Sequence, residues 1–291
     1  MGKRMRDDGT AAERGAGEGM DRDGRTALKK QQEKRQTYVA LIPAYKPRFD
    51  ADEQACVERY FRVLTAEKIV FTVPFGLDTA WYEAHFPKAC YQRFPDRYFR
   101  GIKGYNKLLL SEDFYAAFSE YDYLLIAQPD AVVWKAQDEI PDFMALGYDY
   151  YGAPWQPPRR IWEWTFPKTE KFPFFKVRCV KSPGQGIVMG NGGFSLRHVQ
   201  HCRELIREFR WRKIYWFWKR NEDIFFGVFG RESRRGFRPA DIRTGRMFAL
   251  EYGLRKSVEH GEVPFAVHGW SKEFADYGQM RKFLAEHGIK I

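Results

Sequence analysis

The sequence contains few cysteines, and they lie far apart. The four are Cys56, Cys90, Cys179 and Cys202, and no CxxC pair occurs. Zinc binding and covalent haem attachment are therefore not expected, and the thiols are expected to be reduced. No run of about 18 apolar residues occurs either, so a membrane-spanning helix is not predicted.

Residues 1–36 lack aromatic side chains altogether. Their only large apolar residues are Met1, Met5, Met20 and Leu28. Such a segment cannot bury enough apolar surface to offset the entropy of ordering, and it has no apolar stretch of a secretory signal. We expect residues 1–36 to be a disordered tail, or to precede the true start, and residues 37–291 to form a single domain. With no export signal, a cytosolic location is expected.

Basic residues outnumber acidic ones, and the formal net charge is +11. The tail holds ten Lys or Arg against seven Asp or Glu, so the remaining residues keep +8. A field of this sign favours nucleic acid, an anionic membrane surface or a phosphorylated substrate. The aromatic content of 17% suits a pocket for bases and sugars, and it suits a large ordinary core equally well.

Strand-like and helix-like patterns alternate in the first half of the chain. Strand patterns occupy residues 38–43, 69–73, 89–94 and 123–127, and helical spacing occupies residues 51–68, 79–86 and 106–118. The alternation predicts an α/β fold with a mainly parallel sheet flanked by helices. Ligands of such sheets bind beyond the carboxyl ends of the strands.

The second half is less regular. We predict short strands at residues 186–189 and 264–268, a helix at residues 196–209, and another helix with Asn221 as its N-cap. The segment 155–180 is rich in proline and aromatic residues and is expected to be an ordered loop or lid.

Asp130 directly follows the most apolar strand pattern. Its carboxylate is predicted to project into the crevice at the end of the sheet, where Mg²⁺ or Mn²⁺ binds with one or two carboxylates and substrate phosphates. A turn aspartate also bonds its own backbone, so its position alone leaves a structural role open. His268 ends the late strand beside Gly269. Imidazole suits Mn²⁺ and phosphate, although a single histidine is more often an ordinary packing residue.

Two further segments carry candidate chemistry. The glycines of Gly190-Asn191-Gly192-Gly193 allow close backbone approach to a ligand, and a tight connection without a ligand would use the same residues. This segment matches neither the P-loop nor the GxGxxG pattern. Glu222 and Asp223 open a predicted helix, where the helix dipole favours acids for structural reasons. A carboxylate there is also suited to act as a general base on a sugar hydroxyl.

In chain order, these features resemble the GT-A glycosyltransferases. The segments that carry the resemblance are Gln128-Pro129-Asp130, Gly190-Asn191-Gly192-Gly193, Glu222-Asp223 and His268. More closely, Tyr105-Asn-Lys-Leu-Leu, Tyr123-Leu-Leu-Ile-Ala-Gln-Pro-Asp, Asp149-Tyr-Tyr-Gly-Ala-Pro-Trp, Gly-Asn-Gly-Gly-Phe-Ser-Leu-Arg and Asn-Glu-Asp-Ile-Phe-Phe resemble a family of glycosyltransferase-like proteins of unknown function from bacteria and fungi. The resemblance runs from about Tyr38 to Trp270.

The resemblance implies a nucleotide-sugar donor whose diphosphate is held by Mn²⁺ or Mg²⁺, with Asp130 and His268 at the metal. It implies that Asp223 deprotonates the acceptor hydroxyl, that Glu222 positions Asp223 or the acceptor, and that the anomeric carbon is inverted. The residues expected at the donor and acceptor are Pro43, Tyr45, Lys46, Asn106, Lys107, Gln128, Gly190, Asn191, Gly192 and Gly193. The acceptor is expected to be a carbohydrate or lipid-linked hydroxyl.

One position departs from the usual GT-A motif. That motif has two acids, Asp-x-Asp, whereas this chain has the amide Gln128 at the first of them. The departure predicts weaker metal binding, and it leaves metal-independent catalysis by Lys or Arg open.

Two other functions compete with sugar transfer. A non-catalytic nucleotide-sugar-binding protein would have the same fold. A nucleic-acid-binding protein is suggested by the basic and aromatic residues of segment 210–220. The same segment fits peripheral contact with an anionic membrane beside a lipid-linked acceptor, or a packed helix. Of these partners, nucleic acid is not expected.

Overall fold

The computed structural model describes residues 35–154, 189–210, 222–227, 229–270, 274 and 276–289. These residues form a six-stranded sheet in the order β3-β2-β1-β4-β7-β6. Its strands are β1 (Tyr38–Pro43), β2 (Lys68–Pro74), β3 (Cys90–Phe94), β4 (Tyr123–Ala127), β6 (Tyr150–Tyr151) and β7 (Phe194–His198). The four strands from β3 to β4 are parallel, while β7 runs antiparallel to both β4 and β6. The predicted α/β fold with a mainly parallel sheet is confirmed.

A smaller sheet begins where β4 ends. Its strands are β5 (Ala131–Val133), β8 (Ala249–Leu250) and β9 (Ala266–His268), in the order β5-β9-β8. The antiparallel pairing of β5 with β9 places Ala131 opposite His268. This pairing brings the late histidine to the carboxyl end of β4, although 137 positions separate the two paired residues.

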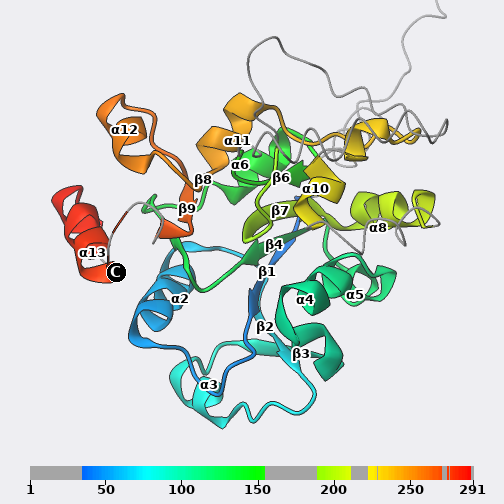
Figure 1. Cartoon of the computed structure of the whole chain (residues 1–291), viewed down its shortest axis with the longest axis horizontal. Helices are drawn as coiled ribbons and strands as arrows, with labels where there is room; N and C mark the ends of the chain where they lie inside the picture. Colours follow the sequence, from blue (N-terminus) through cyan, green and yellow to red (C-terminus); the bar gives the residue numbers. More distant parts are fainter. Residues whose placement is uncertain are drawn as a thin grey trace, which may run out of the picture. The chain divides into compact units, whose positions relative to one another are not determined.

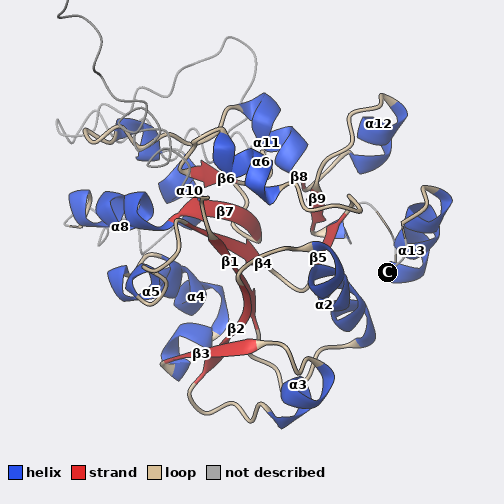
Figure 2. Cartoon of the chain, turned by 180° about the vertical axis from the view of Figure 1, so that it is seen from behind, coloured by secondary structure: helices blue, strands red, loops and turns tan. Residues whose placement is uncertain are grey.

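Helices cover both faces of the six-stranded sheet. The described helices are α2 (Ala51–Val63), α3 (Ala80–His85), α4 (Gly101–Leu109), α5 (Glu112–Ala116), α6 (Ile140–Ala145), α8 (Val199–Glu208), α10 (Glu222–Gly227), α11 (Ile242–Phe248), α12 (Leu254–Glu259) and α13 (Tyr277–Glu286), with short 3₁₀ turns η1 (Asp96–Phe99) and η3 (Phe229–Glu232). Of these, α12 and α13 pack with residues of the smaller sheet instead. Figures 1 and 2 show α2 on one side of β1 and β4, and α4 with α5 on the other. Both faces of the central strands are therefore covered.

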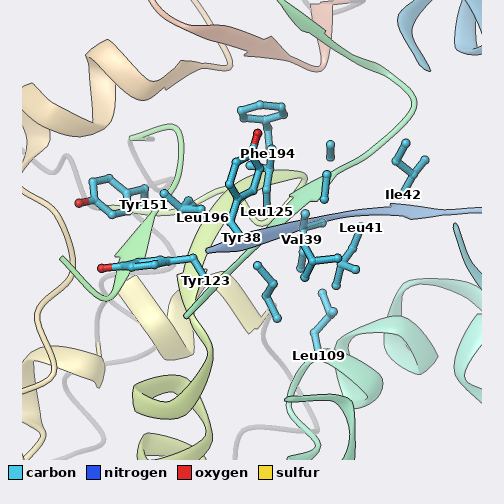
Figure 3. Packing of buried hydrophobic residues seen from close by; sticks show 14 of the residues in the cluster. Tyr38, Val39, Leu41, Ile42, Leu109, Tyr123, Leu125, Tyr151, Phe194 and Leu196 are labelled. Atoms are coloured by element: carbon cyan, nitrogen blue, oxygen red, sulfur yellow. The ribbon is translucent and has the colours of Figure 1, made fainter. Parts of the chain in front are cut away.

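The central strands are buried throughout. Every residue of β1 and β4 is buried, as expected for parallel strands with helices on both faces. Figure 3 shows Val39 and Leu41 with Leu109 on one side of β1, and Leu125, Phe194 and Leu196 on the other. A rigid core of this kind fixes the backbone at the strand ends, where the candidate residues lie.

Three predicted helices were wrong in extent. The helix predicted at residues 106–118 is two helices, α4 and α5, because the Ser111 side chain accepts a hydrogen bond from the Phe114 N–H and caps a new helix. The helix predicted at residues 196–209 begins only at Val199, because the preceding residues form β7, which pairs with β4. The first predicted helix ends at Val63 rather than Lys68.

Several predictions concern residues that the structure does not describe. The predicted lid at residues 155–180 and the N-cap Asn221 lie outside the described residues, as do almost all of the 186–189 strand and the basic segment 210–220. Within the described residues, no helix is both long and apolar enough to cross a membrane. The described cysteines are free thiols, namely Cys56, Cys90 and Cys202.

Candidate functional site

Asp130 lies in a tight turn between β4 and β5. The Ala131 N–H donates to the Gln128 carbonyl (3.0 Å), which closes the turn, and the Gln128 N–H donates to the Gly193 carbonyl (2.8 Å). The Asp130 side chain is 52% exposed. The structure thus places this carboxylate at the carboxyl end of β4, as the sequence predicted. The segment Gly190-Asn191-Gly192-Gly193, called the glycine segment below, is held beside it.

The His268 ring faces the same turn. Its Nε2 atom lies 3.1 Å from Gln128 Oε1 and 3.4 Å from Asp130 Oδ1. The His268 side chain is only 12% exposed. Its Nδ1 atom is buried and has no hydrogen-bond partner among the residues that the structure describes. One ring nitrogen is therefore aimed at two oxygen atoms from the turn after β4.

The side chains of Asp130, Gln128 and His268 suit a divalent cation whose remaining ligands are phosphate and water oxygens. Among the described residues, no group of three or more His, Cys, Asp and Glu side chains forms a metal site of protein ligands alone. Mg²⁺ and Mn²⁺ sites in nucleotide-binding proteins often use one or two carboxylates and take their other oxygens from phosphates and water. Asp130, Gln128 and His268 supply a carboxylate, an amide oxygen and an imidazole nitrogen within one cluster. This donor set suits Mn²⁺.

Glu222 and Asp223 form the first turn of α10, and both are buried, at 5% and 8% exposure. Asp223 Oδ2 accepts the Asn191 N–H (3.1 Å), and Asp223 Oδ1 accepts the Ile224 N–H (2.7 Å). Asn191 has a left-handed backbone, with φ of 51°, and its side-chain oxygen accepts the Gly193 N–H (3.0 Å). The glycine segment is therefore folded tightly against the acid pair.

Glu222 is paired with Arg197. The sequence interpretation included Arg197 in a motif but assigned no role to it. Arg197 Nη2 lies 2.9 Å from Glu222 Oε1, and the arginine side chain is 0% exposed. The interpretation missed this pair because it assigned Arg197 to a helix. In β7, by contrast, Ser195 and Arg197 share one face, and the Arg197 Nε–H donates to Ser195 Oγ (3.0 Å). The alternation of apolar and polar residues from Phe194 onward was the available signal.

The two acids, Glu222 and Asp223, have different electrostatic surroundings. Burial and, after it, the negative charge of Glu222 raise the pKa of Asp223 to about 7, although the Ile224 and Asn191 N–H groups and Arg197 act in the opposite direction. A carboxylate with a pKa near neutral pH is well matched to general-base catalysis. Glu222, in contrast to Asp223, is held in a direct ion pair with Arg197.

The residues predicted to hold the nucleoside lie at the end of β1, which neighbours β4. Pro43 ends β1, Tyr45 is exposed, and Lys46 Nζ lies 2.6 Å from Glu53 Oε1. The predicted donor contacts from α4 differ in exposure, since Asn106 is buried and Lys107 is exposed. The structure thus brings the β1 residues to the same sheet edge as Asp130, with the Lys46 charge already paired.

The two adjacent glycines touch opposite sides of the site. A Cβ atom on Gly192 would lie 1.9 Å from Glu222 Oε1, and one on Gly193 would lie 2.1 Å from His268 Nε2. Both distances are far below van der Waals contact. Neighbouring residues of the glycine segment thus pack against Glu222 and against His268.

We expect Gly193→Ala to displace the His268 ring and to weaken Mn²⁺-dependent ligand binding about tenfold, since partner groups that orient a metal ligand are typically worth about 10–100-fold in affinity. Isothermal titration with Mn²⁺ and a nucleoside diphosphate measures the effect. Gly278→Ala is the matched control, because Gly278 lies in α13, where an added Cβ would approach only the Asp276 side chain, at 3.1 Å. Equal affinity in both variants would contradict the steric role of Gly193.

A family profile described as "Protein of unknown function (DUF5672)" matches residues 88–268. This range is more than half of the chain. The chain belongs to the DUF5672 family. The matched range of this DUF5672 protein begins before β3 and ends at His268, so it includes the turn after β4, the glycine segment and the acid pair.

Solved structures with a similar arrangement of elements include three glycosyltransferases. The mannosyltransferase Ktr4p from S. cerevisiae in complex with GDP is 12% identical, with a TM-score of 0.47 over 75% of this chain and 69% of that one. Core-mannan synthase A from Aspergillus fumigatus, in a Mn/GDP form, is 10% identical (TM-score 0.46; 67% and 70%). The glycosyltransferase GlyE from Streptococcus pneumoniae is 12% identical (TM-score 0.45; 88% and 61%). This chain covers less than two thirds of GlyE, and 57% of a Mycobacterium tuberculosis glucosyl-3-phosphoglycerate synthase that is 12% identical (TM-score 0.35). A comparison with curated proteins gave no match.

Proposed function

We propose that this protein is a GT-A-type glycosyltransferase, which moves a sugar from a nucleotide-sugar donor to an acceptor hydroxyl with inversion at the anomeric carbon. The observation that carries the proposal is the glycine segment, because Asn191 donates its N–H to Asp223 and Gly193 packs against His268. A potential general base and a potential cation site thus flank one short loop at the carboxyl edge of the sheet, where α/β folds bind ligands.

In this proposal the donor diphosphate lies beside Asp130, Gln128 and His268. These residues would hold Mn²⁺ or Mg²⁺, which would neutralise the charge that develops on the leaving diphosphate. The nucleoside would lie along Pro43, Tyr45 and Lys46 at the end of β1, with Asn106 and Lys107 near the donor. The positive net charge of the chain favours such an anionic donor.

Asp223 is the proposed general base. It removes the proton from the acceptor hydroxyl as the oxygen bonds to the anomeric carbon and the bond to the diphosphate breaks. Its elevated pKa fits this role, because a base near neutral pH combines a usable ionised fraction with proton affinity. Glu222 faces Arg197 instead, so its proposed role is to position the loop and Asp223. The acceptor class expected from the sequence, a carbohydrate or lipid-linked hydroxyl, stays a prediction.

A screen of nucleotide sugars by thermal unfolding, with and without Mn²⁺, tests donor binding. We expect at least one nucleotide sugar to raise the Tm only when Mn²⁺ is present, since a ligand at 100 times its Kd stabilises the folded state by about 2.7 kcal/mol. Release of nucleoside diphosphate in the presence of acceptor mixtures then reports transfer. An unchanged Tm with every nucleotide sugar would contradict the proposed donor.

A further inference from the structure

Arg197 is the largest fully buried side chain in the described structure, and its hydrogen bonds join elements that surround the candidate site. Its Nη2 atom pairs with Glu222 Oε1 (2.9 Å), Nη1 donates to the Tyr115 hydroxyl (3.1 Å) and Nε donates to Ser195 Oγ (3.0 Å). A buried arginine that is bonded through all three of its nitrogen atoms holds its partners in one geometry, because breaking any of these bonds leaves a buried polar group without compensation.

Two of these contacts converge on the same glycine. Ser195 Oγ–H donates to the Gly192 carbonyl (3.0 Å). On the other side, Glu222 Oε1 would lie only 1.9 Å from a Cβ atom added to Gly192. Arg197 therefore supports Gly192 through Ser195 on one side and through Glu222 on the other. The next residue back, Asn191, donates its N–H to Asp223.

The guanidinium is also confined by aromatic rings. Its Cζ atom lies 5.0 Å from the ring centroid of Phe226 in α10 and 5.5 Å from that of Tyr150 in β6. Phe226 belongs to the same short helix as the acid pair. A cation held over ring faces gains electrostatic attraction in addition to packing. Arg197 thus links β6, β7, α5 and α10 around the glycine segment.

We propose that Arg197 is a positioning residue, which acts through Ser195 and Glu222 to hold the glycine segment and Asp223 in the orientation that transfer requires. The inference rests on the proposed function, since it assigns Asp223 the reacting position. Arg197 itself touches neither donor nor acceptor in this arrangement. Its removal would act on turnover by moving Asp223 and not by removing a ligand contact.

The test weakens this network from its outer end, because replacing Arg197 itself endangers folding. Tyr115→Phe removes the hydroxyl that accepts from Arg197 Nη1. Tyr123→Phe is the matched control, because Tyr123 is similarly buried and its hydroxyl donates to the Tyr148 carbonyl (3.0 Å), away from Arg197. We expect Tyr115→Phe to lower kcat about three- to tenfold with an unchanged KM for the donor, the size of one ordinary net hydrogen bond. Tyr123→Phe should lower the Tm without changing kcat.

Ser195 provides a second variant with a conservative rescue. Ser195→Ala removes the link from Arg197 to the Gly192 carbonyl, and Ser195→Thr retains the hydroxyl in a strand position that accepts a β-branched residue. We expect the alanine variant to lose kcat as Tyr115→Phe does and the threonine variant to recover most of it. Equal kcat in all four variants and the wild type would overturn the positioning role.

Hydrogen exchange of the Asn191 and Gly193 amides separates this inference from the proposed function, because it needs no substrate. Faster exchange of these amides in Tyr115→Phe and Ser195→Ala, but not in Tyr123→Phe, supports the positioning role. Exchange that is unchanged in every variant contradicts it. Absence of turnover by the wild-type protein with every nucleotide sugar would instead contradict the proposed function.

Discussion

Asp223→Asn should lower kcat about 10²–10⁴-fold, the usual contribution of a positioned general base. The amide cannot take a proton from the acceptor hydroxyl, whereas its size matches that of the carboxylate. The donor does not contact Asp223 in the proposed arrangement, so the Kd for the nucleotide sugar should change little. Steady-state kinetics, together with donor binding by calorimetry, measures both quantities.

The wild-type pH profile should report the same carboxylate. A general base works only when ionised, and burial raises the pKa of Asp223 to about 7. The value of kcat/KM should therefore fall about tenfold for each pH unit below about 7 and level off above it, where the ionised fraction no longer increases. In Asp223→Asn the remaining activity should lose this acidic limb.

Asp122→Asn is a suitable control for both measurements. Asp122 accepts the Thr37 N–H (2.9 Å) just before β4 begins, at the end of the strand opposite to the candidate site. Its replacement should leave kcat and the pH profile unchanged. Donor binding with Mn²⁺ by both the wild type and Asp223→Asn, without turnover by either protein, would favour the alternative of a non-catalytic binding protein.

The sequence predicted the parallel strands closely. The first strand was predicted with its observed limits, and β2, β3 and β4 agree within one residue at each end. β1, β2 and β4 are mostly apolar and buried, and burial on both faces makes their apolar signal strong, whereas the edge strand β3 contains Gln92 and Arg93 and is mostly half-buried or exposed. Asp130 was placed correctly for the same reason, since it directly follows the clearest of these runs.

The contacts within the site depend on pairings that leave no local signal. The end of β7, residues 196–198, was assigned to a helix because its polar residue Arg197 is buried by partners from α5 and α10 rather than exposed to water. Likewise, the approach of His268 to Asp130 follows from the pairing of β5 with β9. Neither pairing follows from local propensity, because each joins segments that are distant in the chain.

Asp130→Ala should weaken Mn²⁺-dependent donor binding by at least about 100-fold, and His268→Ala by about 10–100-fold, on the scale known for groups that bind or orient a metal. Asp130 supplies the only carboxylate among the three candidate ligands, while His268 is nearly buried against Gln128. The effect should appear as a higher Mn²⁺ concentration for half-maximal activity, with the folded state intact by circular dichroism.

Gln128→Glu should act in the opposite direction. A second carboxylate at this position restores the charge of an Asp-x-Asp motif and places it 3.1 Å from His268 Nε2 in the present geometry, so Mn²⁺ binding should tighten. His260→Ala is the control for general loss of a histidine, because His260 is exposed at the end of α12 and its ring bonds the Lys256 carbonyl. Full wild-type activity after chelation of divalent cations, combined with no response to either Gln128→Glu or Asp130→Ala, would contradict a cation at this site. Lys or Arg side chains would then have to balance the charge of the leaving diphosphate. This is the metal-independent alternative that the replacement of the first motif acid by Gln128 leaves open.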